Sequence, residues 1–477
     1  MNDLQNKTVR VRFAPSPTGH LHIGGLRTAL FNWLFARHNK GSYLLRIEDT
    51  DANRDKQEYV DSIFGSFAWT GILPDEKPVI QSTRIAHHQQ VIDQLIAQKK
   101  AYKCYCAPDD HVKRLQARGA DTLFVKYDGY CRTRTATADS STPYAVRFAL
   151  PLNRTSIVFD DLIRGRVEMP MEQLDDFVIA RSIGAPMYNF VVVVDDAFMG
   201  ITHVIRAEEH LVNTPKQILL YQACNYPIPQ FAHVPLILGP SGDKLSKRDG
   251  AVSVLEYRQA GYLPGALINY LARLGWAHGD QEIFSIDELI QYFTLDAIGK
   301  KGAIFDPQKL DWVNSVYIRA LDTETILSTI QADVMPTLME HIQHWPHAQV
   351  LAIIELYRER VSTLKQLAHI LVALHNDPTT YPVQEGNPWI TEQTASYIEQ
   401  FIALIENDPL FTLDTSKEHA KHVCKRYSVK LGLLAQPIRI SLTGSSEGPG
   451  AFELMIALGK EVSIKRMRML LKHYWSK

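Results

Sequence analysis

The hydrophobic and polar positions near the start of the chain predict a strand, a loop and a helix. Apolar and basic residues alternate over Val9–Phe13, which is the period of a half-buried strand. Two prolines then exclude a helix until Thr18, after which apolar residues recur at helical spacing from Leu26 to about Arg37. Tyr43–Ile47 is predicted as the next strand.

A second group of patterns, within residues 188–245, predicts more of the same architecture. The continuous apolar run Phe190–Val194 is typical of a buried parallel strand. Further strands are predicted at Ile201–Ile205 and Phe231–Leu238. Between them a helix is expected to begin near Asn213, with Pro215 in its first turn. The two groups together indicate an α/β sheet built from two separate segments of the chain.

The remaining patterns indicate an inserted domain and a helical C-terminal part. Between the two α/β segments lie three cysteines, a turn-rich stretch at 132–142 and an apparent antiparallel strand at Tyr144–Leu150. After about residue 320, leucine, isoleucine and alanine recur at helical spacing, which predicts helical bundles. Asn, Asp and Pro residues between 376 and 388 predict a boundary between two bundles.

Composition narrows the class of protein only modestly. The 477 residues are 45% hydrophobic and 22% charged, contain no apolar run of membrane-spanning length and begin without an apolar signal segment. Five cysteines are too few for a disulfide scaffold, so we expect a cytoplasmic protein with reduced thiols. The net charge of −1 is unusual for a nucleic-acid-binding protein, but lysine and arginine cluster at 417–430 and 460–477. Each cluster could contact phosphates or simply be a solvated helix face.

The loop after the first strand has the composition of a phosphate site. Residues 14–24 are APSPTGHLHIG, and a helix is predicted to follow. Free N–H groups at a helix N-terminus favour phosphate, Gly19 and Gly24 permit close approach, and His22 can donate a hydrogen bond. Without further evidence, a proline- and glycine-rich loop before a helix is also an ordinary connection.

A second loop carries two lysines three residues apart. Lys244 and Lys247 lie in KLSKR, after a Gly/Ser/Asp-rich turn. Two such cations can stabilise charge that develops on a leaving pyrophosphate. Standing alone, this segment would be interpreted as a basic surface loop. The sequence has no Gly-x-x-x-x-Gly-Lys-Ser/Thr loop, so a P-loop NTPase is not expected.

Together, and in this order, the two loops resemble the two signatures of class I aminoacyl-tRNA synthetases. Gly25 stands where the general signature has a second histidine, as is usual in the glutamyl branch of the class. The chain is similar to bacterial-type glutamyl-tRNA synthetases in order and over nearly its whole length. The segments that carry this resemblance are RFAPSPTG at 12–19, LRIEDTD at 45–51, GITHVIR at 200–206, LIL at 236–238 leading into KLSKRDG at 244–250, and PIRISLTG at 437–444.

The resemblance implies a class I Rossmann-like α/β catalytic domain that is split by an inserted acceptor-binding domain. An all-α anticodon-binding region follows it. The divisions expected are the first catalytic half at 1–86, the inserted domain at 87–187, the second catalytic half at 188–245, the second signature loop with a stem-contact domain at 246–322, and two anticodon-binding bundles at 323–378 and 379–477.

The activity implied by the resemblance is the ATP-dependent attachment of L-glutamate to tRNA(Glu). The reaction would pass through glutamyl-adenylate and release AMP and pyrophosphate, with Mg²⁺ accompanying ATP. We expect a monomer. Two alternatives stay open at this point: a paralogue that charges the glutamine tRNA, and a non-catalytic tRNA-binding protein.

The resemblance also assigns roles to individual residues. Glu48 and Arg206 could instead form structural ion pairs, with Arg46 and with Glu208 or Glu209 respectively. Arg358 and Arg360 are candidates for contact with the anticodon, although plain surface arginines would look the same. The roles implied are catalysis by His22, Lys244 and Lys247, ATP binding by Thr18, Gly19, His22, Gly24 and Lys247, and glutamate binding by Arg12, Ser16, Glu48, Tyr188 and Arg206.

Three clustered cysteines suggest a metal site in the inserted domain. Cys104, Cys106 and Cys131 offer three soft ligands, and a closed tetrahedral Zn²⁺ site needs a fourth. Some relatives have a histidine two residues after the last cysteine, where this chain has Thr133. Others use a tyrosine four residues before that cysteine, which corresponds to Tyr127. His111 or an aspartate is the alternative fourth ligand, and three free thiols without metal are the alternative to a site. One zinc ion would be structural.

Overall fold

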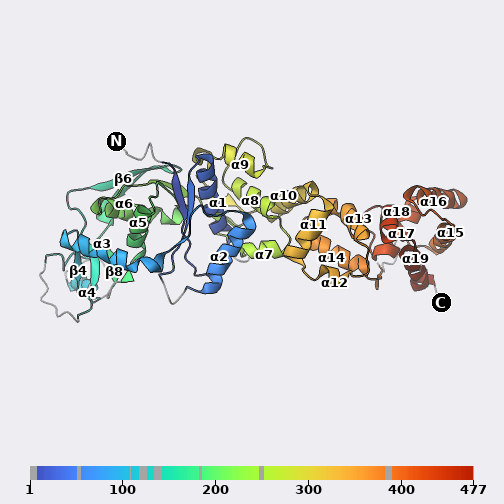
Figure 1. Cartoon of the computed structure of the whole chain (residues 1–477), viewed down its shortest axis with the longest axis horizontal. Coiled ribbons are helices and arrows are strands. Elements are labelled where there is room, and N and C mark those ends of the chain that lie inside the picture. The colour runs from blue at the N-terminus through green and yellow to red at the C-terminus, as the bar shows by residue number, and fades with distance from the viewer. Residues whose placement is uncertain are drawn as a thin grey trace. The chain divides into compact units, whose positions relative to one another are not determined.

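The computed structural model describes residues 8–50, 55–107, 109–117, 126–133, 142–181, 185–245, 252–381 and 389–475. The chain divides into two compact units. The first consists of Met1–Leu255 and Ile268–Asp306, and the second of Glu256–Leu267 and Pro307–Lys477. The first unit is mixed α/β and the second is helical where it is described (Figure 1), which confirms the predicted fold class. Among the described helices, none is long and apolar enough to cross a membrane.

The predicted strand, loop and helix at the start of the chain are confirmed. Strand β1 (Arg10–Phe13) is followed by helix α1 (Ile23–His38) and by β2 (Ser42–Ile47), which pairs with β1 in parallel. Strand β3 (Val79–Ile80) extends this sheet on the far side of β2. Because a parallel pair needs a crossover, α1 serves as that crossover, and it packs against both strands with most of its side chains buried.

A second sheet contributes the other half of the α/β part. Its strand order is β10 (His203–Ala207), β11 (Gln230–Val234), β6 (Ser156–Asp161) and β7 (Gly165–Pro170), with β10 and β11 parallel. The two sheets meet where the Thr202 amide donates to the Arg10 carbonyl over 2.9 Å. Strands from distant parts of the chain therefore lie side by side, as the two separate α/β patterns predicted.

The prediction of a strand at Phe190–Val194 is wrong, because this segment lies in helix α5 (Tyr188–Phe198). All residues from Phe190 to Asp196 are buried. A helix buried on every side has no polar face, so its sequence loses the helical period and resembles a buried strand. Helix α6 (Thr214–Ala223) follows Asn213 with Pro215 in its first turn, as predicted, and packs against α5.

The single strand predicted at Phe231–Leu238 is two strands. Strand β11 ends at Val234, and β12 (Ile237–Leu238) pairs with β13 (Ala303–Ile304) in another sheet. Pro235 lies between them. Because proline has no N–H group to donate to a ladder, it ends the first pairing.

The segment between the two α/β halves contains the antiparallel sheet that the sequence predicted. Its strand order is β4 (Ala101–Cys104), β5 (Ala145–Phe148), β8 (Val178–Arg181) and β9 (Ala185–Pro186). This sheet shares an apolar core with α5 and β11, through residues such as Phe148, Phe190 and Phe231. The six divisions of the chain proposed from the sequence stay a prediction.

The remaining regular elements of the described structure are helical (Figure 1). Sequence features explain several helix starts, for example the capping box in which Thr363 and Gln366 satisfy the first backbone groups of α14. The remaining helices are α2 (Gln57–Thr70), α3 (Ile85–Ala97), α4 (Asp110–Ala117), α7 (Val254–Gln259), α8 (Pro264–Arg273), α9 (Ile286–Tyr292), α10 (Pro307–Ala320), α11 (Thr323–Thr329), α12 (Leu338–His341), α13 (His347–Tyr357), α14 (Leu364–His375), α15 (Glu392–Glu406), α16 (Leu413–Tyr427), α17 (Gly432–Thr443), α18 (Ala451–Leu458) and α19 (Lys460–Trp475).

Candidate active site

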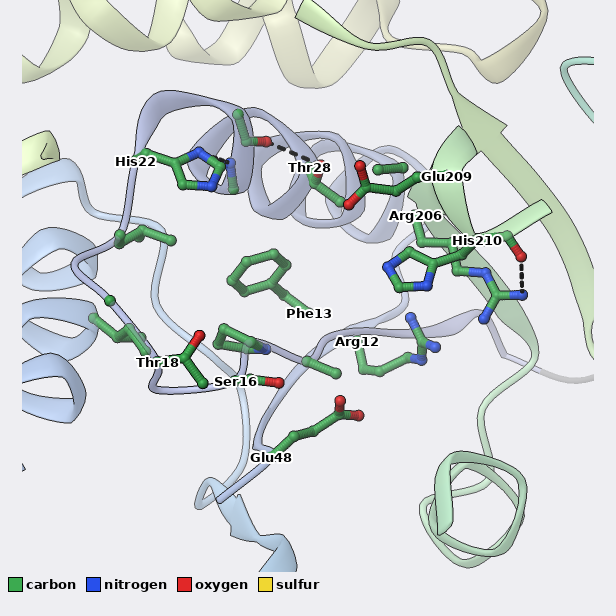
Figure 2. A pocket seen from close by; sticks show the side chains of 18 of the residues that line it. Arg12, Phe13, Ser16, Thr18, His22, Thr28, Glu48, Arg206, Glu209 and His210 are labelled. Carbon is green, nitrogen blue, oxygen red and sulfur yellow. Dashed lines mark hydrogen bonds between the residues drawn. The ribbon is translucent and has the colours of Figure 1, made fainter. Parts of the chain in front are cut away.

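A cavity of about 430 Å³ opens at the carboxyl ends of β1, β2 and β10. This is the edge at which parallel α/β sheets usually bind ligands, because the loops that leave the strands converge there. Arg12, Glu48 and Arg206 lie toward one end of the cavity, while Thr18 and His22 lie toward the other (Figure 2). The residues predicted from the sequence that line it are Arg12, Ser16, Thr18, Gly19, His22, Gly24, Glu48, Tyr188 and Arg206.

The His22 end of the cavity is the N-terminus of α1. His22 is the N-cap residue, and its Nδ1 accepts a hydrogen bond from the Gly25 amide over 3.2 Å. Burial lowers the pKa of His22, and the Lys244 ammonium lowers it further. A neutral ring whose Nδ1 accepts must carry its proton on Nε2, so Nε2 is the donor that remains for a ligand. Gly24 makes room for this ring, since a Cβ at this position would lie 3.1 Å from it.

At the opposite end, one carboxylate holds two arginines. Asp196 from α5 accepts two hydrogen bonds from Arg12, at 3.0 and 3.2 Å, and one from Arg46 at 2.6 Å. Burial acts to raise the pKa of Asp196, but the two guanidinium groups outweigh it and hold the pKa below its ordinary value. Asp196 therefore stays ionised and fixes the position of Arg12.

Glu48 forms the ion pair with Arg46 that the sequence left open as an alternative. Its Oε1 accepts from Arg46 Nη2 at 2.9 Å, while no described residue donates a hydrogen bond to Oε2. Burial raises the pKa of Glu48, and the Arg46 charge opposes this shift. One carboxylate oxygen thus lines the cavity without a donor, although the residue also has a structural partner.

Arg206 does not pair with Glu208 or Glu209, the alternative partners considered from the sequence. Glu208 pairs with Arg164, and Glu209 pairs with Lys244. The Arg206 guanidinium donates to the His210 carbonyl and to Thr214, but its buried Nη1 has no hydrogen-bond partner among the described residues. A buried donor without an acceptor is costly, which suggests that a ligand supplies the acceptor.

The second predicted lysine loop is described only in part. Lys244 lies beside the cavity, with its Nζ 2.8 Å from Glu209 Oε2. This pair is largely exposed, so the contact is weak and can exchange for another anion. Lys247 lies outside the described residues.

Several residues of the site carried no signal in the sequence. Asp196, His210 and His233 belong to no motif, and Glu209 entered only as a possible ion-pair partner of Arg206. A histidine or aspartate of this kind acquires a role only from the side chains that the fold brings next to it. The physical signal that could have drawn attention to Asp196 is an acidic pair at the end of a buried segment.

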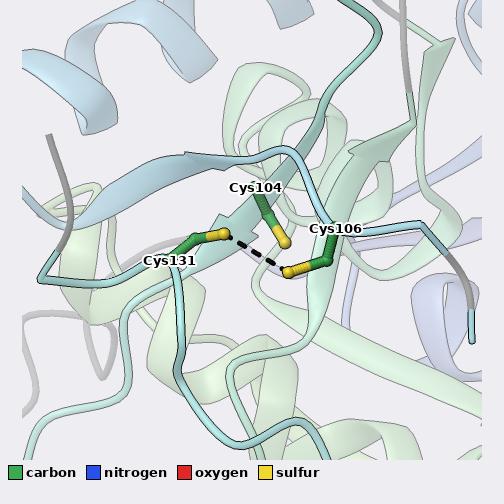
Figure 3. Close-up of side chains that lie close together, drawn as sticks. All are labelled: Cys104, Cys106 and Cys131. Carbon is green, nitrogen blue, oxygen red and sulfur yellow. Dashed lines mark hydrogen bonds between the residues drawn. The ribbon is translucent and has the colours of Figure 1, made fainter. Parts of the chain in front are cut away.

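The three predicted cysteines converge (Figure 3). The sulfur atoms of Cys104, Cys106 and Cys131 all lie within 4.8 Å of one another, and those of Cys106 and Cys131 are 3.4 Å apart. The hydroxyl oxygen of Tyr127 lies 3.3 Å from Cys104 Sγ and 3.9 Å from Cys106 Sγ. The side chain of the alternative ligand, His111, lies outside the described residues. Three thiols and a phenol at these distances could hold one metal ion.

The two arginines considered for anticodon contact lie in a short 3₁₀ turn, Arg358–Arg360, not within a long helix. Arg358 is partly engaged, since it donates to the Leu321 carbonyl at 2.9 Å and pairs with Glu355. Arg360 is exposed. Arg466 belongs to the basic cluster at 460–477. It is 1% exposed and donates to three backbone carbonyls. Arg466 is therefore structural, and only part of the predicted basic surface is available to a partner.

Both parts of the chain match known protein families. Residues 8–312 match the family of tRNA synthetases class I (E and Q), catalytic domain, and residues 333–471 match an anticodon binding domain. The fold and the cavity at the strand ends are those of a class I tRNA synthetase.

Individual relatives narrow this class. A glutamate–tRNA ligase of Geotalea uraniireducens is 44% identical over 97% of this chain and 98% of its own. Glutamate–tRNA ligase 1 of Syntrophus aciditrophicus is also 44% identical, and 97% of each chain is covered. A crystal structure of a glutamate tRNA ligase from Elizabethkingia meningosepticum, in complex with its amino acid, matches with a TM-score of 0.87 at 33% identity, over 98% of this chain and 99% of that one. The chain belongs to the glutamate–tRNA ligase family.

Proposed function

We propose that this chain attaches L-glutamate to tRNA(Glu) in an ATP-dependent reaction. The observation that carries the proposal is the two-ended cavity. One end offers a buried guanidinium with an unpartnered donor, and the other offers a helix N-terminus with a neutral histidine. An anionic amino acid suits the first end, and a nucleotide phosphate suits the second.

Glutamate would be held by charge and shape. The planar guanidinium groups of Arg12 and Arg206 match carboxylates, and Ser16 and Tyr188 line the same cavity with hydroxyl groups. Glu48 offers its free carboxylate oxygen to the substrate ammonium. A neutral side chain of the same length would leave a buried guanidinium unpaired, which is the basis for selectivity.

The ATP end would supply positioning and positive charge. The backbone amides at the start of α1 and the Nε2 proton of His22 face the phosphates, with Thr18, Gly19 and Gly24 lining the approach. Lys244 and Lys247 are the cations proposed to stabilise the leaving pyrophosphate, and Mg²⁺ accompanies ATP in this class.

The chemistry needs no protein nucleophile. The glutamate α-carboxylate attacks the α-phosphorus of ATP, forming glutamyl-adenylate and releasing pyrophosphate. A terminal ribose hydroxyl of the tRNA then attacks the mixed anhydride, forming the ester and releasing AMP. The enzyme's contribution is to align the reactants and to stabilise the charge that develops on the phosphates.

The decisive test is charging of purified glutamate and glutamine tRNAs, each separately, with labelled glutamate and ATP. Charging of the glutamate tRNA alone is the expected result. Charging of the glutamine tRNA would instead identify a supplier of misacylated tRNA. Charging of neither would overturn the proposal and favour a tRNA-binding protein. The Lys247→Ala variant should lose ATP–pyrophosphate exchange, and unchanged exchange would remove this lysine from the mechanism.

The cysteine cluster would hold one structural Zn²⁺ ion, with Cys104, Cys106, Cys131 and Tyr127 as ligands. The convergence of the four side chains supports this ligand set. A zinc ion there would cross-link the end of β4 to the segment around Cys131, and no strand pairing among the described residues joins these two.

Zinc removal provides a direct test. The purified protein should contain about one zinc per chain by elemental analysis, and a chelator should lower its melting temperature. Cys131→Ser should abolish zinc binding, whereas Cys424→Ser, which changes a free cysteine of the helical unit, should retain it. Tyr127→Phe should weaken zinc binding. Wild-type protein without zinc, or full zinc content in Cys131→Ser, would contradict the proposed site.

The partners proposed are tRNA(Glu), L-glutamate and ATP, with the helical unit providing the anticodon contacts, among them Arg358 and Arg360. We further propose that the protein acts as a monomer in the cytoplasm. The five cysteines are all free thiols in the structure, as a reducing compartment would maintain them.

A further inference from the structure

The direction in which Arg206 points is fixed by contacts outside the cavity. Arg206 Nε donates to His233 Nε2 over 3.1 Å, and Nη2 donates to the Thr214 hydroxyl over 2.7 Å. Thr214 Oγ1 in turn lies 3.1 Å from His233 Nε2. Arg206, Thr214 and His233 are all buried. This triangle occupies two guanidinium nitrogens and leaves Nη1 as the donor that can meet a ligand. Figure 2 shows Arg206 beside Arg12 and His210 at this end of the cavity.

The triangle requires one particular protonation state of His233. An arginine N–H can only donate, so His233 Nε2, which accepts from Arg206 Nε, must be a lone-pair acceptor. The ring proton must then lie on Nδ1. Burial lowers the pKa of His233, and although Asp161 opposes this shift, the pKa stays below its ordinary value, so the ring is neutral near pH 7.

Asp161 selects this tautomer. Its Oδ2 accepts from His233 Nδ1 over 2.5 Å. Its Oδ1 accepts from the backbone amides of Ile163, Arg164 and His233, at 3.0, 2.8 and 3.2 Å. Burial acts to raise the pKa of Asp161, but the His233 and backbone hydrogen bonds outweigh it and hold the pKa below its ordinary value. Asp161 is therefore a pure acceptor, and it keeps the Nδ1 proton of His233 in place.

We infer that His233, held by Asp161, is a positioning residue that aims the Arg206 guanidinium at a carboxylate of the glutamate substrate. This inference rests on the carboxylate-binding role proposed for Arg206. A long arginine side chain has many rotamers, and a ligand that had to order it would lose affinity. By fixing Nε and Nη2 in advance, His233 and Thr214 leave only Nη1 to be satisfied by substrate.

Two substitutions at His233 separate positioning from support of the fold. His233→Asn keeps a donor near the Nδ1 position for Asp161 but removes the acceptor for Arg206. His233→Gln places a carbonyl oxygen near the Nε2 position for Arg206 but loses the donor to Asp161. The matched control is His88→Asn, because His88 is equally buried and pairs with Asp195 at 2.8 Å.

Glutamate-dependent pyrophosphate exchange with tRNA present gives the KM for glutamate and for ATP, and thermal melting is measured in parallel. His233→Asn should raise the KM for glutamate about tenfold or more and leave the KM for ATP within about twofold, since a hydrogen bond to a charged group is lost. His233→Gln should raise the KM for glutamate less than His233→Asn does. His88→Asn should lower the melting temperature without a selective change in either KM.

The reverse order, with His233→Gln raising the glutamate KM more than His233→Asn, would show that His233 only anchors Asp161 and would overturn the inference. So would an unchanged glutamate KM in a folded His233→Asn variant. If His233→Asn does not fold, a folded His233→Gln variant must keep its glutamate KM within about threefold of wild type, and a larger rise overturns the inference. Failure of the wild-type enzyme to charge tRNA would instead count against the proposed function.

Discussion

At the scale of single residues, Asp196 ties two arginines to one carboxylate and so determines where Arg12 lies. Both guanidinium groups and the carboxylate are at most 4% exposed. A buried charge is tolerated only while it is paired, and although Arg46 also pairs with Glu48, Asp196 is the anion that pairs with Arg12, so Arg12 is sensitive to its loss.

Replacing this anion should be costly. Asp196→Asn should lower the free energy of unfolding by about 3–5 kcal/mol, because the buried Arg12 guanidinium would lose its anion and Arg46 would keep only Glu48. Urea unfolding measures this difference. Glu76→Gln, which alters the exposed pair with Arg10, should cost no more than about 1 kcal/mol. Equal effects of the two substitutions would mean that burial does not control the strength of these pairs.

The same group predicts the direction of acid sensitivity. The folded pKa of Asp196 is below its ordinary value, so the stabilisation is fully present above the unfolded pKa of about 3.9 and is lost as the pH falls through the folded pKa. Wild-type protein should therefore lose stability more steeply than Asp196→Asn as the pH falls below about 4. Parallel curves of unfolding free energy against pH would contradict this prediction.

Lys244 is the described lysine of the second loop, and it contacts Glu209 only weakly. Lys244→Ala should slow ATP–pyrophosphate exchange about a hundredfold and change the KM for glutamate little, because its charge is proposed to act on the phosphates. Lys301→Ala, which removes an exposed lysine outside the cavity, is the control. A rate for Lys244→Ala within about twofold of wild type would show that this lysine takes no part in the reaction.

At the scale of elements, the connection between α7 and α8 depends on one glycine. Gly261 has a φ of +85°, and its carbonyl accepts from the Leu364 amide at the start of α14 over 2.9 Å. A Cβ at this position would overlap the backbone nitrogen of Lys365. The positive φ and the close backbone approach both require glycine.

Gly261→Ala should therefore lower the free energy of unfolding by about 3 kcal/mol or more, because backbone atoms cannot move aside cheaply. Gly71→Ala is the matched control, with a φ of +75° and no atom within 4 Å of the added Cβ. It should cost only about 1 kcal/mol, from backbone strain alone. Similar costs would show that crowding at Gly261 is relieved by a shift of α14.

Elements also show where sequence patterns succeed. Residues 10–47 were predicted correctly as strand, helix and strand, because arginine alternates with apolar residues in β1 and polar residues such as Thr28 and Asn32 interrupt the apolar positions of α1, although both elements are largely buried. Helix α5 was mistaken for a strand because its buried centre, Phe190–Val194, is an unbroken run of apolar and mostly β-branched residues. Pro235 divides β11 from β12 in the structure. The prediction of one strand followed the apolar residues on both sides of Pro235 and did not take account of the proline.

At the scale of the whole molecule, a net charge of −1 must be reconciled with an RNA partner. Several C-terminal cations serve the fold or pair locally, including Arg466, Lys417 and Arg468. Lys421 and Lys425 on α16 are exposed. We expect affinity for tRNA to come from such local surfaces and not from the charge of the whole chain.

Salt should therefore weaken tRNA binding and leave amino-acid binding unaffected. Raising salt from about 50 to 200 mM should increase the KM for tRNA steeply, while the KM for glutamate changes little because its site is buried. Lys421→Glu should reduce the salt slope by ~1 if this lysine contacts a phosphate. Lys77→Glu makes the same change of charge at an exposed position in the other unit and serves as the control. Equal slopes for the two variants would exclude α16 from the RNA contact.

The sequence by itself determined the class of fold, the family resemblance and nine of the residues that line the cavity. Motif residues such as His22, Glu48 and Arg206 are close to the ends of predicted strands and helices, so local pattern is enough to place them at one edge of a sheet. Their individual roles stay predictions.

Only the tertiary structure decided how those residues are held. Asp196 accepts directly from Arg12, and Asp161 acts on Arg206 through His233. Both aspartates come from elements far away in the chain, and no local period encodes these contacts. Hydrogen-bond and ionic partners, acting against burial, then keep Asp161 and Asp196 charged, and the partners of His233 set which of its nitrogens carries the proton. The physical reason is that hydrogen-bond partners and desolvation are properties of the packed molecule, whereas the hydrophobic period is a property of the chain.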